Sequence, residues 1–426
     1  MALLARVKNI LGLTRENIPI WGTSIGHGYV HWFPATFYLL LPLVKEELHL
    51  TYTEMGLLVT VRYVFSMVTN FPAGMLADMV GKHSLFLTIA LAWVGIPYFF
   101  VGISDSYATL LVCMSFLGIG NTLWHPAAMS ILHEVYPRKR GWAMGWHASA
   151  ANVGDALGPF MTGILLTWFT WRAILIGSAI PGVAMGLFIW WLLGASPQGN
   201  PADPGAPQKG QEAGKSGKKK LSTREYLRGF VRLLIDRNVF LLAMINGVRS
   251  LTQNGLSTYL PPFFMTLLGI SPWLSGVYLT VIQVAGIIAA PISGRVSDHY
   301  GRKRVVMAAL LSTSVALLLL IFLHIPWLFV VILGGVGFFL YSLRPVLIAW
   351  AMEIAPQELG GTVVGLQFTF QSALSALAPV LGGWIADRWG LMVTFYFLAA
   401  TVVFSNILAF LIRESPQSGV AATKSA

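Results

Sequence analysis

The chain has 426 residues, of which 56% are hydrophobic and 11% are charged. A soluble globular protein carries about a quarter charged residues, so this composition excludes water as the main solvent. The single cysteine, Cys113, excludes an intramolecular disulfide and a thiolate metal cluster. The net charge of +11 is spread over short segments between apolar stretches, so no nucleic-acid partner is expected.

Apolar stretches of about 20 residues recur along nearly the whole chain, and each is long enough to cross about 30 Å of hydrocarbon as a helix. The sequence therefore predicts an all-α membrane protein whose helices span the lipid bilayer. Twelve transmembrane helices are expected, at residues 20–44, 54–79, 83–102, 107–132, 141–168, 171–194, 238–267, 273–297, 303–323, 327–352, 361–388 and 391–412.

The apolar pattern stops at residues 195–237, where Pro, Gly, Lys and Gln dominate. Such a composition predicts a flexible, basic linker. It divides the chain into an N-terminal six-helix half, residues 1–194, and a C-terminal six-helix half, residues 238–412. Residues 413–426 are expected to form a tail.

The distribution of basic residues predicts the orientation. If the N-terminus is cytoplasmic, 21 of the 28 Lys and Arg residues lie in cytoplasmic segments and 3 lie outside. The positive-inside rule then places both termini and the linker in the cytoplasm. Residues 1–17 have no small-residue cleavage site behind a short apolar segment, so they are interpreted as retained. We expect a multi-pass protein of the cytoplasmic (inner) membrane.

The two halves align with a nearly constant offset. Asp78 corresponds to Asp298 and Pro159 to Pro379, each 220 residues apart, and Pro126 corresponds to Pro345 at 219. An offset held over several helices indicates an internal parallel duplication. In transporters built this way, the working site lies near the middle of the membrane.

The loops after the second and eighth spans read GMLADMVGKH from residue 74 and GRVSDHYGRK from residue 294. Both resemble the G-x-L-x-D-x-x-G-R-K loop of the major facilitator superfamily, a family of secondary transporters with twelve helices in two pseudo-repeats. Glycines permit close helix approach and a tight turn, and the Asp can meet a basic side chain. The expected gating residues are Gly74, Asp78, Gly81, Lys82, Gly294, Asp298, Gly301 and Arg302.

The fifth span contains glycines at a spacing similar to the antiporter signature of that superfamily, with Thr162 in place of one of them. Stretches such as HGYVHWFPATFYLLLP and GIGNTLWHPAA look like its fosmidomycin-resistance branch of drug exporters. The resemblance implies proton-coupled export and tight packing of the fifth span. The residues of this antiporter-like helix are Gly145, Gly154, Gly158, Pro159 and Gly163.

Few ionisable residues fall inside the predicted spans, where each charge costs at least about 2.5 to 3.5 kcal/mol to insert. In the superfamily, spans 1, 4, 7 and 10 line the central cavity, so histidines and arginines on these spans are expected near one site. The candidates for the substrate and proton cavity are His27, His31, Arg62, His125, His147, Asp155, Arg249 and Arg344.

These residues suggest how transport is driven. Histidine titrates near neutral pH, and burial raises the pKa of a carboxylate toward the same range. We hypothesise that His31 or Asp155 carries a coupling proton and that Arg249 and Arg344 bind an anionic part of the substrate. The driving force is then a proton gradient, with no cofactor and no resident metal, and one chain suffices as a monomer.

Two alternatives stay open, and a third, a membrane enzyme, is disfavoured. The intramembrane arginines also suit an organic-anion importer or exchanger. Clustered histidines suit a metal or metallophore transporter, since nitrogen ligands bind zinc or nickel. A membrane enzyme would need a catalytic motif, and the sequence contains no nucleotide-binding loop, nucleophile elbow or His-Glu-x-x-His. We therefore expect a transporter of small molecules rather than an enzyme.

Overall fold

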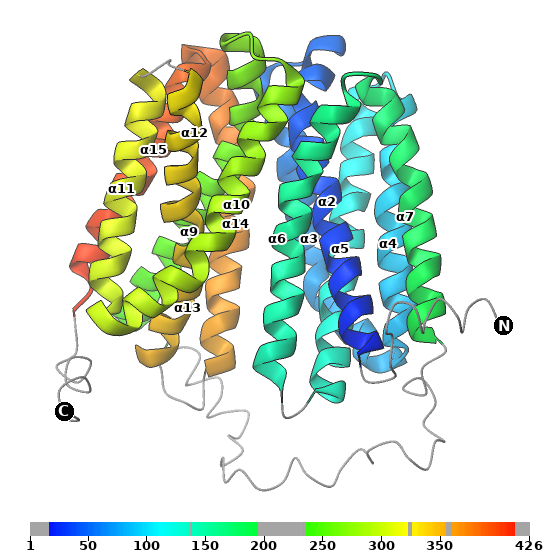
Figure 1. The fold of residues 1–426 in the computed structure, drawn as a ribbon, viewed down its shortest axis with the longest axis horizontal. Helices are drawn as coiled ribbons and strands as arrows, with labels where there is room; N and C mark the ends of the chain where they lie inside the picture. The colour runs from blue at the N-terminus through cyan, green and yellow to red at the C-terminus, as the bar shows by residue number, and fades with distance from the viewer. Residues whose placement is uncertain are drawn as a thin grey trace, which may run out of the picture. The chain divides into compact units, whose positions relative to one another are not determined.

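The computed structural model describes residues 17–136, 139–194, 233, 235–322, 326–354 and 360–413. Every regular element within these ranges is a helix (Figure 1). The chain forms two compact units, residues 1–48 with 61–209 and residues 49–60 with 210–426, and each is described by itself. The predicted linker, 195–237, and the tail, 413–426, lie almost entirely outside the described residues.

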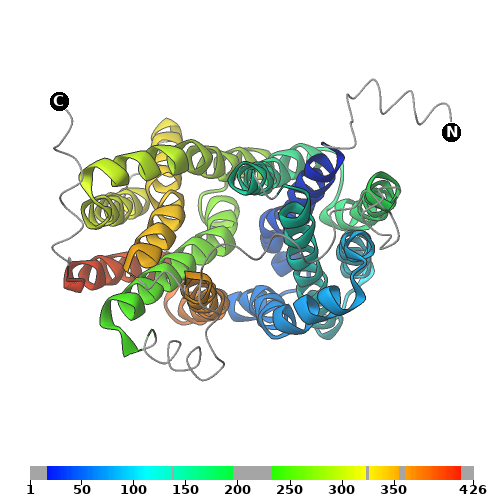
Figure 2. The same ribbon diagram turned by 90° about the horizontal axis from the view of Figure 1, so that it is seen from below.

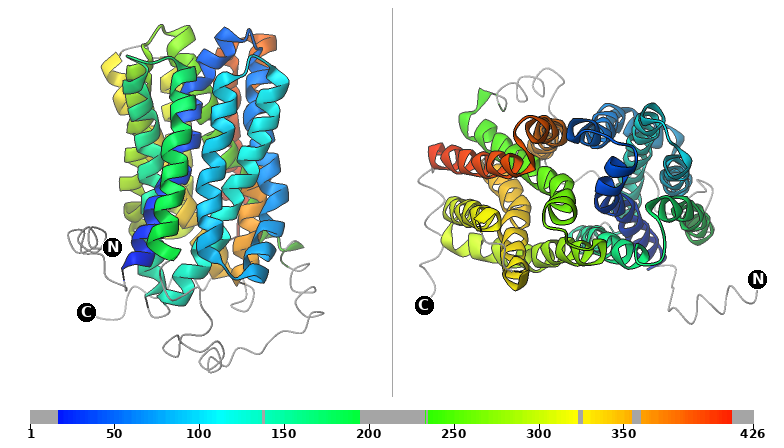
Figure 3. Two further views of the ribbon diagram at one scale, coloured as in Figure 1. Left: turned by 90° about the vertical axis from the view of Figure 1, so that its right-hand side faces the viewer. Right: turned by 90° about the horizontal axis from the view of Figure 1, so that it is seen from above.

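Six long helices belong to the first half of the sequence. They are α2 (Ile18–Glu47), α3 (Tyr52–Val80), α4 (His83–Ile103), α5 (Tyr107–Val135), α6 (Arg140–Leu165) and α7 (Trp171–Gly194). The first residues of α3, up to residue 60, are grouped with the second unit. Within the first unit, α2 packs along α6, and α4 packs along α7 and α5 (Figures 1 and 3).

Small residues make the contacts of α2 close. A Cβ added to Gly154 of α6 would lie 2.0 Å from the Gly28 carbonyl oxygen of α2, so the two backbones touch at this level. A Cβ on Gly26 would lie 1.9 Å from the ring of Trp124, a fully buried residue of α5. Close approach through glycine is typical of helix packing in membranes. These contacts fix α2 against α5 and α6 at the level of its histidines.

The second half forms six further membrane-length helical segments, two of which include a π-helical stretch. They are α9 (Arg237–Pro262) with η2 (Phe263–Leu267), α10 (Pro272–Tyr300), α11 (Arg302–Phe322), α12 (Pro326–Val336) with η3 (Gly337–Tyr341) and α13 (Leu343–Ile354), α14 (Gly360–Trp389) and α15 (Leu391–Leu411). Helix α9 packs along α14 and α15, and α11 lies beside α15 (Figure 2).

The π-helical segment η3 marks a close contact. A Cβ on Gly337 would lie 2.1 Å from the carbonyl oxygen of Ile282 on α10, and one on Gly286 would lie 2.7 Å from Tyr341. The sequence predicted one uninterrupted span at 327–352, and the structure places this wider turn inside it. Wider turns of this kind occur mostly as single bulges within α-helices.

The predicted all-α architecture with twelve spans is confirmed, with helix ends within a few residues of the predicted ones. Judged by length and composition alone, eight of the described helical segments are long and apolar enough to cross a membrane. The other four, α2, α3, α6 and α9, carry most of the polar candidates.

Candidate functional site

The candidate site of the first unit is centred on a carboxylate–histidine pair between α2 and α6. His31 Nδ1 lies 3.1 Å from both carboxylate oxygens of Asp155. The side chains of His31 and Asp155 are 32% and 29% exposed, respectively, so the protein covers most of the pair but leaves part of it accessible from outside. An ionised carboxylate only accepts hydrogen bonds, so the His31 Nδ1–H donates and Nε2 faces away from Asp155.

His27 lies one turn before His31 on the same face of α2. Its Nδ1–H donates to the backbone carbonyl of His147, at 2.7 Å, and the two rings stack with centroids 3.8 Å apart. His27 is buried, and its Nε2 has no hydrogen-bond partner among the described residues. An unsatisfied polar atom inside a membrane protein is costly, which makes it a candidate binding atom.

His125 of α5 completes the group. Its ring centroid lies 5.1 Å from that of His27 and 6.3 Å from that of His31, with both pairs of rings nearly perpendicular. The structure brings four candidate histidines of the first half close together: α2 contributes two, α5 one and α6 one. Below, the histidine cluster denotes His27, His31 and His125.

The antiporter-like glycines explain why Asp155 reaches His31. Gly154 touches Gly28, and a Cβ on Gly158 would lie 2.9 Å from the Trp32 carbonyl oxygen, so both glycines face α2 next to the pair. Gly145 has open space where a Cβ would stand. Thr162, which replaces a motif glycine, donates to Thr36 Oγ1 of α2 at 3.0 Å and so adds a polar contact to the same interface.

Pro159 and Gly163 complete the antiporter-like helix. Pro159 lies inside α6, where it has no N–H to donate to the helix. Gly163 lies in the last turn of α6 before its end at Leu165. Neither residue has a described contact with the histidine cluster.

Arg62 of α3 occupies a different environment in the same unit. It is 8% exposed, donates to Tyr38 Oη at 3.1 Å and stacks on Tyr63 at 4.7 Å from the ring centroid. The adjoining pocket has a volume of about 10 Å³, room for about one water. Arg62 is therefore enclosed by tyrosines, and no pattern in the sequence singled out these two partners.

In the second unit, Arg249 of α9 is buried, with 2% exposure. Its guanidinium donates to Gln253 Oε1 at 2.7 Å, to Ser250 Oγ at 2.7 Å and to Asn246 Oδ1 at 3.4 Å. All three partners are neutral, and no ion pair among the described residues includes Arg249. Its positive charge is therefore solvated by the protein but not neutralised by a carboxylate.

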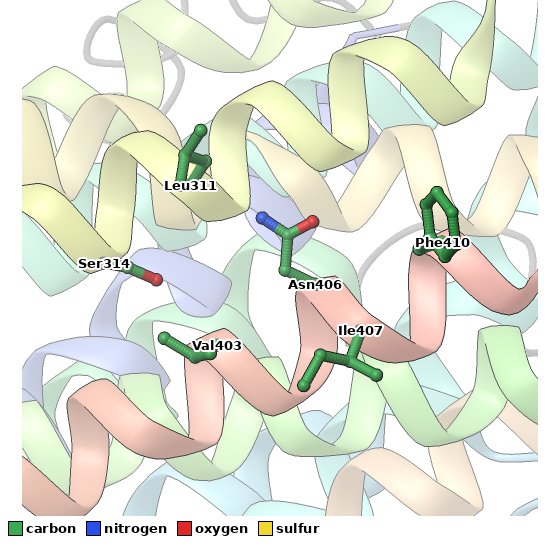
Figure 4. A pocket seen from close by; sticks show the side chains of 6 residues that line it. All are labelled: Leu311, Ser314, Val403, Asn406, Ile407 and Phe410. Carbon is green, nitrogen blue, oxygen red and sulfur yellow. The ribbon is translucent and has the colours of Figure 1, made fainter.

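Arg344 of α13 is exposed and lies over the ring of Phe368, 5.2 Å from its centroid. A pocket of about 310 Å³ lies elsewhere, between α11 and α15, and its lining includes Leu311, Val403 and Phe410 (Figure 4). It contains none of the candidate residues, and its lining is mainly apolar. A pocket of this composition suits a lipid chain better than a polar substrate.

The two gating loops each contain a glycine with a positive φ angle. Gly81 and Gly301 have φ of +67° and +91°, a conformation that favours glycine, so the turns need them. Lys82 is exposed, Gly294 has open space at its Cβ position, and the side-chain surroundings of Gly74 and Asp78 lie outside the description.

The second loop forms an ion-pair network. Arg302 lies 2.5 Å from Asp298 Oδ1 and 2.8 Å from Glu353 Oε1 of α13. Glu353, which the motif did not include, links the loop to another helix.

The helical fold and the buried polar groups define an integral-membrane secondary transporter. The sequence model of the Major Facilitator Superfamily matches residues 24–373 and 242–426, so the chain belongs to this superfamily. Its members are transporters rather than enzymes, as the sequence predicted.

The relatives share the whole length of the chain. It is 26% identical to the multidrug resistance protein MdtG of Proteus mirabilis over 409 residues, 91% of this chain and 96% of MdtG. It is 23% identical to the glycerol-3-phosphate transporter of Bacillus subtilis over 406 residues, 91% of this chain and 89% of that one.

A solved structure supports the fold. The bacterial homologue of the human lysosomal transporter Spinster, in an inward-facing and unoccupied conformation, matches with a TM-score of 0.77 and 16% identity, covering 95% of this chain and 99% of that chain.

Proposed function

We propose that this transporter exports a small organic compound, drug-like or anionic, in exchange for protons by alternating access. The observation that carries the proposal is the His31–Asp155 pair, a carboxylate and an imidazole in contact between two transmembrane helices. An ionisable pair inside a membrane protein is expensive to insert, and such residues are typical of proton relays.

Proton binding changes the net charge of the pair. With neutral imidazole and ionised carboxylate the pair carries one negative charge, and one added proton makes it neutral overall. A neutral pair costs less to enclose in a low-dielectric interior than a charged one. Protonation can therefore favour one arrangement of the transporter, and substrate binding the other, which is the condition for coupling.

Export rather than import is supported by two observations. The glycines that hold α6 against α2 follow the spacing of the antiporter signature, and Gly154 and Gly158 both face α2. Relatives that match along almost the full chain include proteins described as multidrug resistance proteins, from several bacteria. We place both termini in the cytoplasm of an inner-membrane protein that works as a monomer and needs no cofactor.

An organic-anion importer or exchanger is the second candidate. Arg249 favours it, because a buried guanidinium with only neutral partners attracts an anionic group. The relatives described as glycerol-3-phosphate and hexose phosphate transport proteins fit the same interpretation. The two candidates differ in the direction of transport and in the need for protons.

Purified protein in liposomes tests the proposal. Substrate-triggered proton movement is recorded with a pH dye inside the vesicles while ethidium, fosmidomycin and glycerol-3-phosphate are added in turn. We expect proton flux with at least one compound in the wild type and in Glu134→Gln, an exposed carboxylate on α5. The flux is expected to vanish in Asp155→Asn and in His31→Ala.

Uptake of radiolabelled compound in the same vesicles separates the alternatives. Transport that persists without a proton gradient and is unchanged in Asp155→Asn would contradict proton coupling. If such transport is lost only in Arg249→Gln, the anion exchanger is the correct interpretation.

A further inference from the structure

We propose that His27, His31 and His125 form a binding site for one divalent transition-metal ion of the zinc and nickel class. The sequence predicted no resident metal, although its clustered histidines left a metal or metallophore transporter open as an alternative. The structure brings three histidines from two helices together. One ligand nitrogen from each lies within 4.8 Å of the others.

This distance is compatible with a common metal ion. At a metal–nitrogen distance of about 2.0–2.1 Å, tetrahedral geometry places two ligand nitrogens about 3.4 Å apart. Each nitrogen therefore needs to move by about 1 Å or less. The rings of His27 and His31, at 86°, and of His27 and His125, at 88°, are nearly perpendicular, so they do not stack on one another.

The hydrogen bonds of two members select the ligand atom. His27 Nδ1 is held by the His147 carbonyl oxygen and His31 Nδ1 by Asp155, so each keeps Nε2 for a metal. Metal-bound histidines almost always donate their other N–H to a carboxylate or a backbone carbonyl in this way. The cluster therefore contains both a carboxylate acceptor, Asp155, and a backbone carbonyl acceptor, that of His147. The buried His27 Nε2 has no hydrogen-bond partner among the described residues.

The donor set decides the class of ion. Imidazole nitrogens suit zinc, nickel and copper(II), whereas calcium and magnesium need oxygen ligands. Three protein ligands leave a coordination position open, and His31 and His125 are only half-buried. Asp155 supplies one negative charge next to the site, which lowers the cost of placing a cation there.

The inference goes beyond the proposed function and does not depend on it, because metal binding is measured without a membrane gradient. The full chain is purified in detergent with an affinity tag that contains no histidine and is treated with a chelator. Zn²⁺ and Co²⁺ are then titrated, with calorimetry for the first and the visible absorption of tetrahedral Co²⁺ for the second. We expect one equivalent of either ion to bind.

Substitutions locate the ion. His27→Ala, His31→Ala and His125→Ala are each expected to weaken binding at least about 100-fold, and Asp155→Asn about 10- to 100-fold. His133→Ala is the matched control, since His133 is exposed on the same helix as His125. It is expected to leave the affinity unchanged. Thermal unfolding of each variant shows that it is folded.

His125→Cys adds a positive signature. A thiolate ligand produces a charge-transfer band with Co²⁺ that imidazole does not, so this variant is expected to bind the ion and to show that band. Either of two results overturns the inference: no binding tighter than millimolar in the wild type, or one-equivalent binding that all three alanine variants retain.

Discussion

Arg249 and Asp155 differ in how the protein balances their charge. Asp155 has an imidazole partner, whereas the guanidinium of Arg249 is surrounded by amide and hydroxyl oxygens. A buried charge held only by neutral dipoles keeps much of its attraction for a counter-ion. At the residue scale, the proposed proton and metal-ion site lies in the first unit and the proposed anion site in the second.

Replacing Arg249 with Gln should weaken binding of an anionic compound. The variant keeps a polar group next to Gln253 and Ser250 but removes the charge that an anion would meet. Hydrogen bonds to charged groups contribute about 1.5–3 kcal/mol, so affinity should fall by about 10- to 150-fold. Calorimetric titration with glycerol-3-phosphate and fosmidomycin measures it. Arg295→Gln, an exposed arginine on α10, serves as the control, and an equal loss there would contradict a specific role.

Gly154, but not Gly145, determines how closely α6 packs against α2. Gly154 meets the α2 backbone, and Gly145 meets nothing, although both belong to the same sequence signature. The spacing alone predicted tight packing of the whole span. The structure restricts that role to the part of α6 that lies beside Asp155.

Gly154→Ala should therefore separate α2 from α6. The added methyl group would stand 2.0 Å from the Gly28 carbonyl oxygen, so the helices must move apart and the His31–Asp155 hydrogen bond must lengthen. Overpacking typically costs about 1–3 kcal/mol. Thermal unfolding in detergent should show this destabilisation for Gly154→Ala and none for Gly145→Ala. Equal stability of both variants would contradict the contact.

A second contact between helices is made by Arg172 of α7, which connects the end of α2 to the end of α4. Arg172 donates to Glu47 Oε1 and to Asp105 Oδ1, each at 2.6 Å, and to the Ser104 carbonyl at 2.8 Å. The hydrogen bond from Arg172 is the main reason why the pKa of Glu47 lies below its ordinary value, with a further hydrogen bond from Trp171 acting in the same direction.

The sign of the pH effect follows from that lowered pKa. A carboxylate whose pKa is lower in the folded state stabilises the fold above the pKa of the unfolded state, and the contribution disappears as pH falls through the folded-state value. Glu47→Gln should thus reduce stability at neutral pH by about 1 kcal/mol or less, since Glu47 is 48% exposed. Unfolding curves of the two proteins should converge in acid, and a constant difference at all pH values would exclude this cause.

For the whole molecule, the sequence was sufficient to predict the twelve spans, because apolar stretches of membrane length leave few other folds. The resemblance to the superfamily also grouped His27, His31 and His125, because it implies that spans 1 and 4 line the central cavity. The partners of Arg62 and Arg249 were not predictable. Tyr38, Tyr63 and Gln253 are common residues whose importance depends on side-chain direction, which the sequence does not specify.

The orientation in the membrane is a prediction for the whole chain. On a background of Cys113→Ala, His49→Cys should react with a membrane-impermeant maleimide added to intact cells, because residue 49 follows α2 on the expected outer side. Lys139→Cys, between α5 and α6, should react only after the cells are permeabilised. Both positions are exposed. The reverse pattern of labelling would invert the assigned topology.

The His31–Asp155 contact also has a consequence during biosynthesis. The two residues are 124 positions apart in the chain, so at about 5–20 residues per second the ribosome needs about 6–25 s to supply Asp155 after His31. During that interval α2, one of the less apolar helices, resides at the translocon without its polar partner. A chain that never supplies the partner, such as Asp155→Leu, prolongs that state indefinitely. Membrane quality-control proteases should then remove it, so the cellular amount of such a variant falls before transport can be measured.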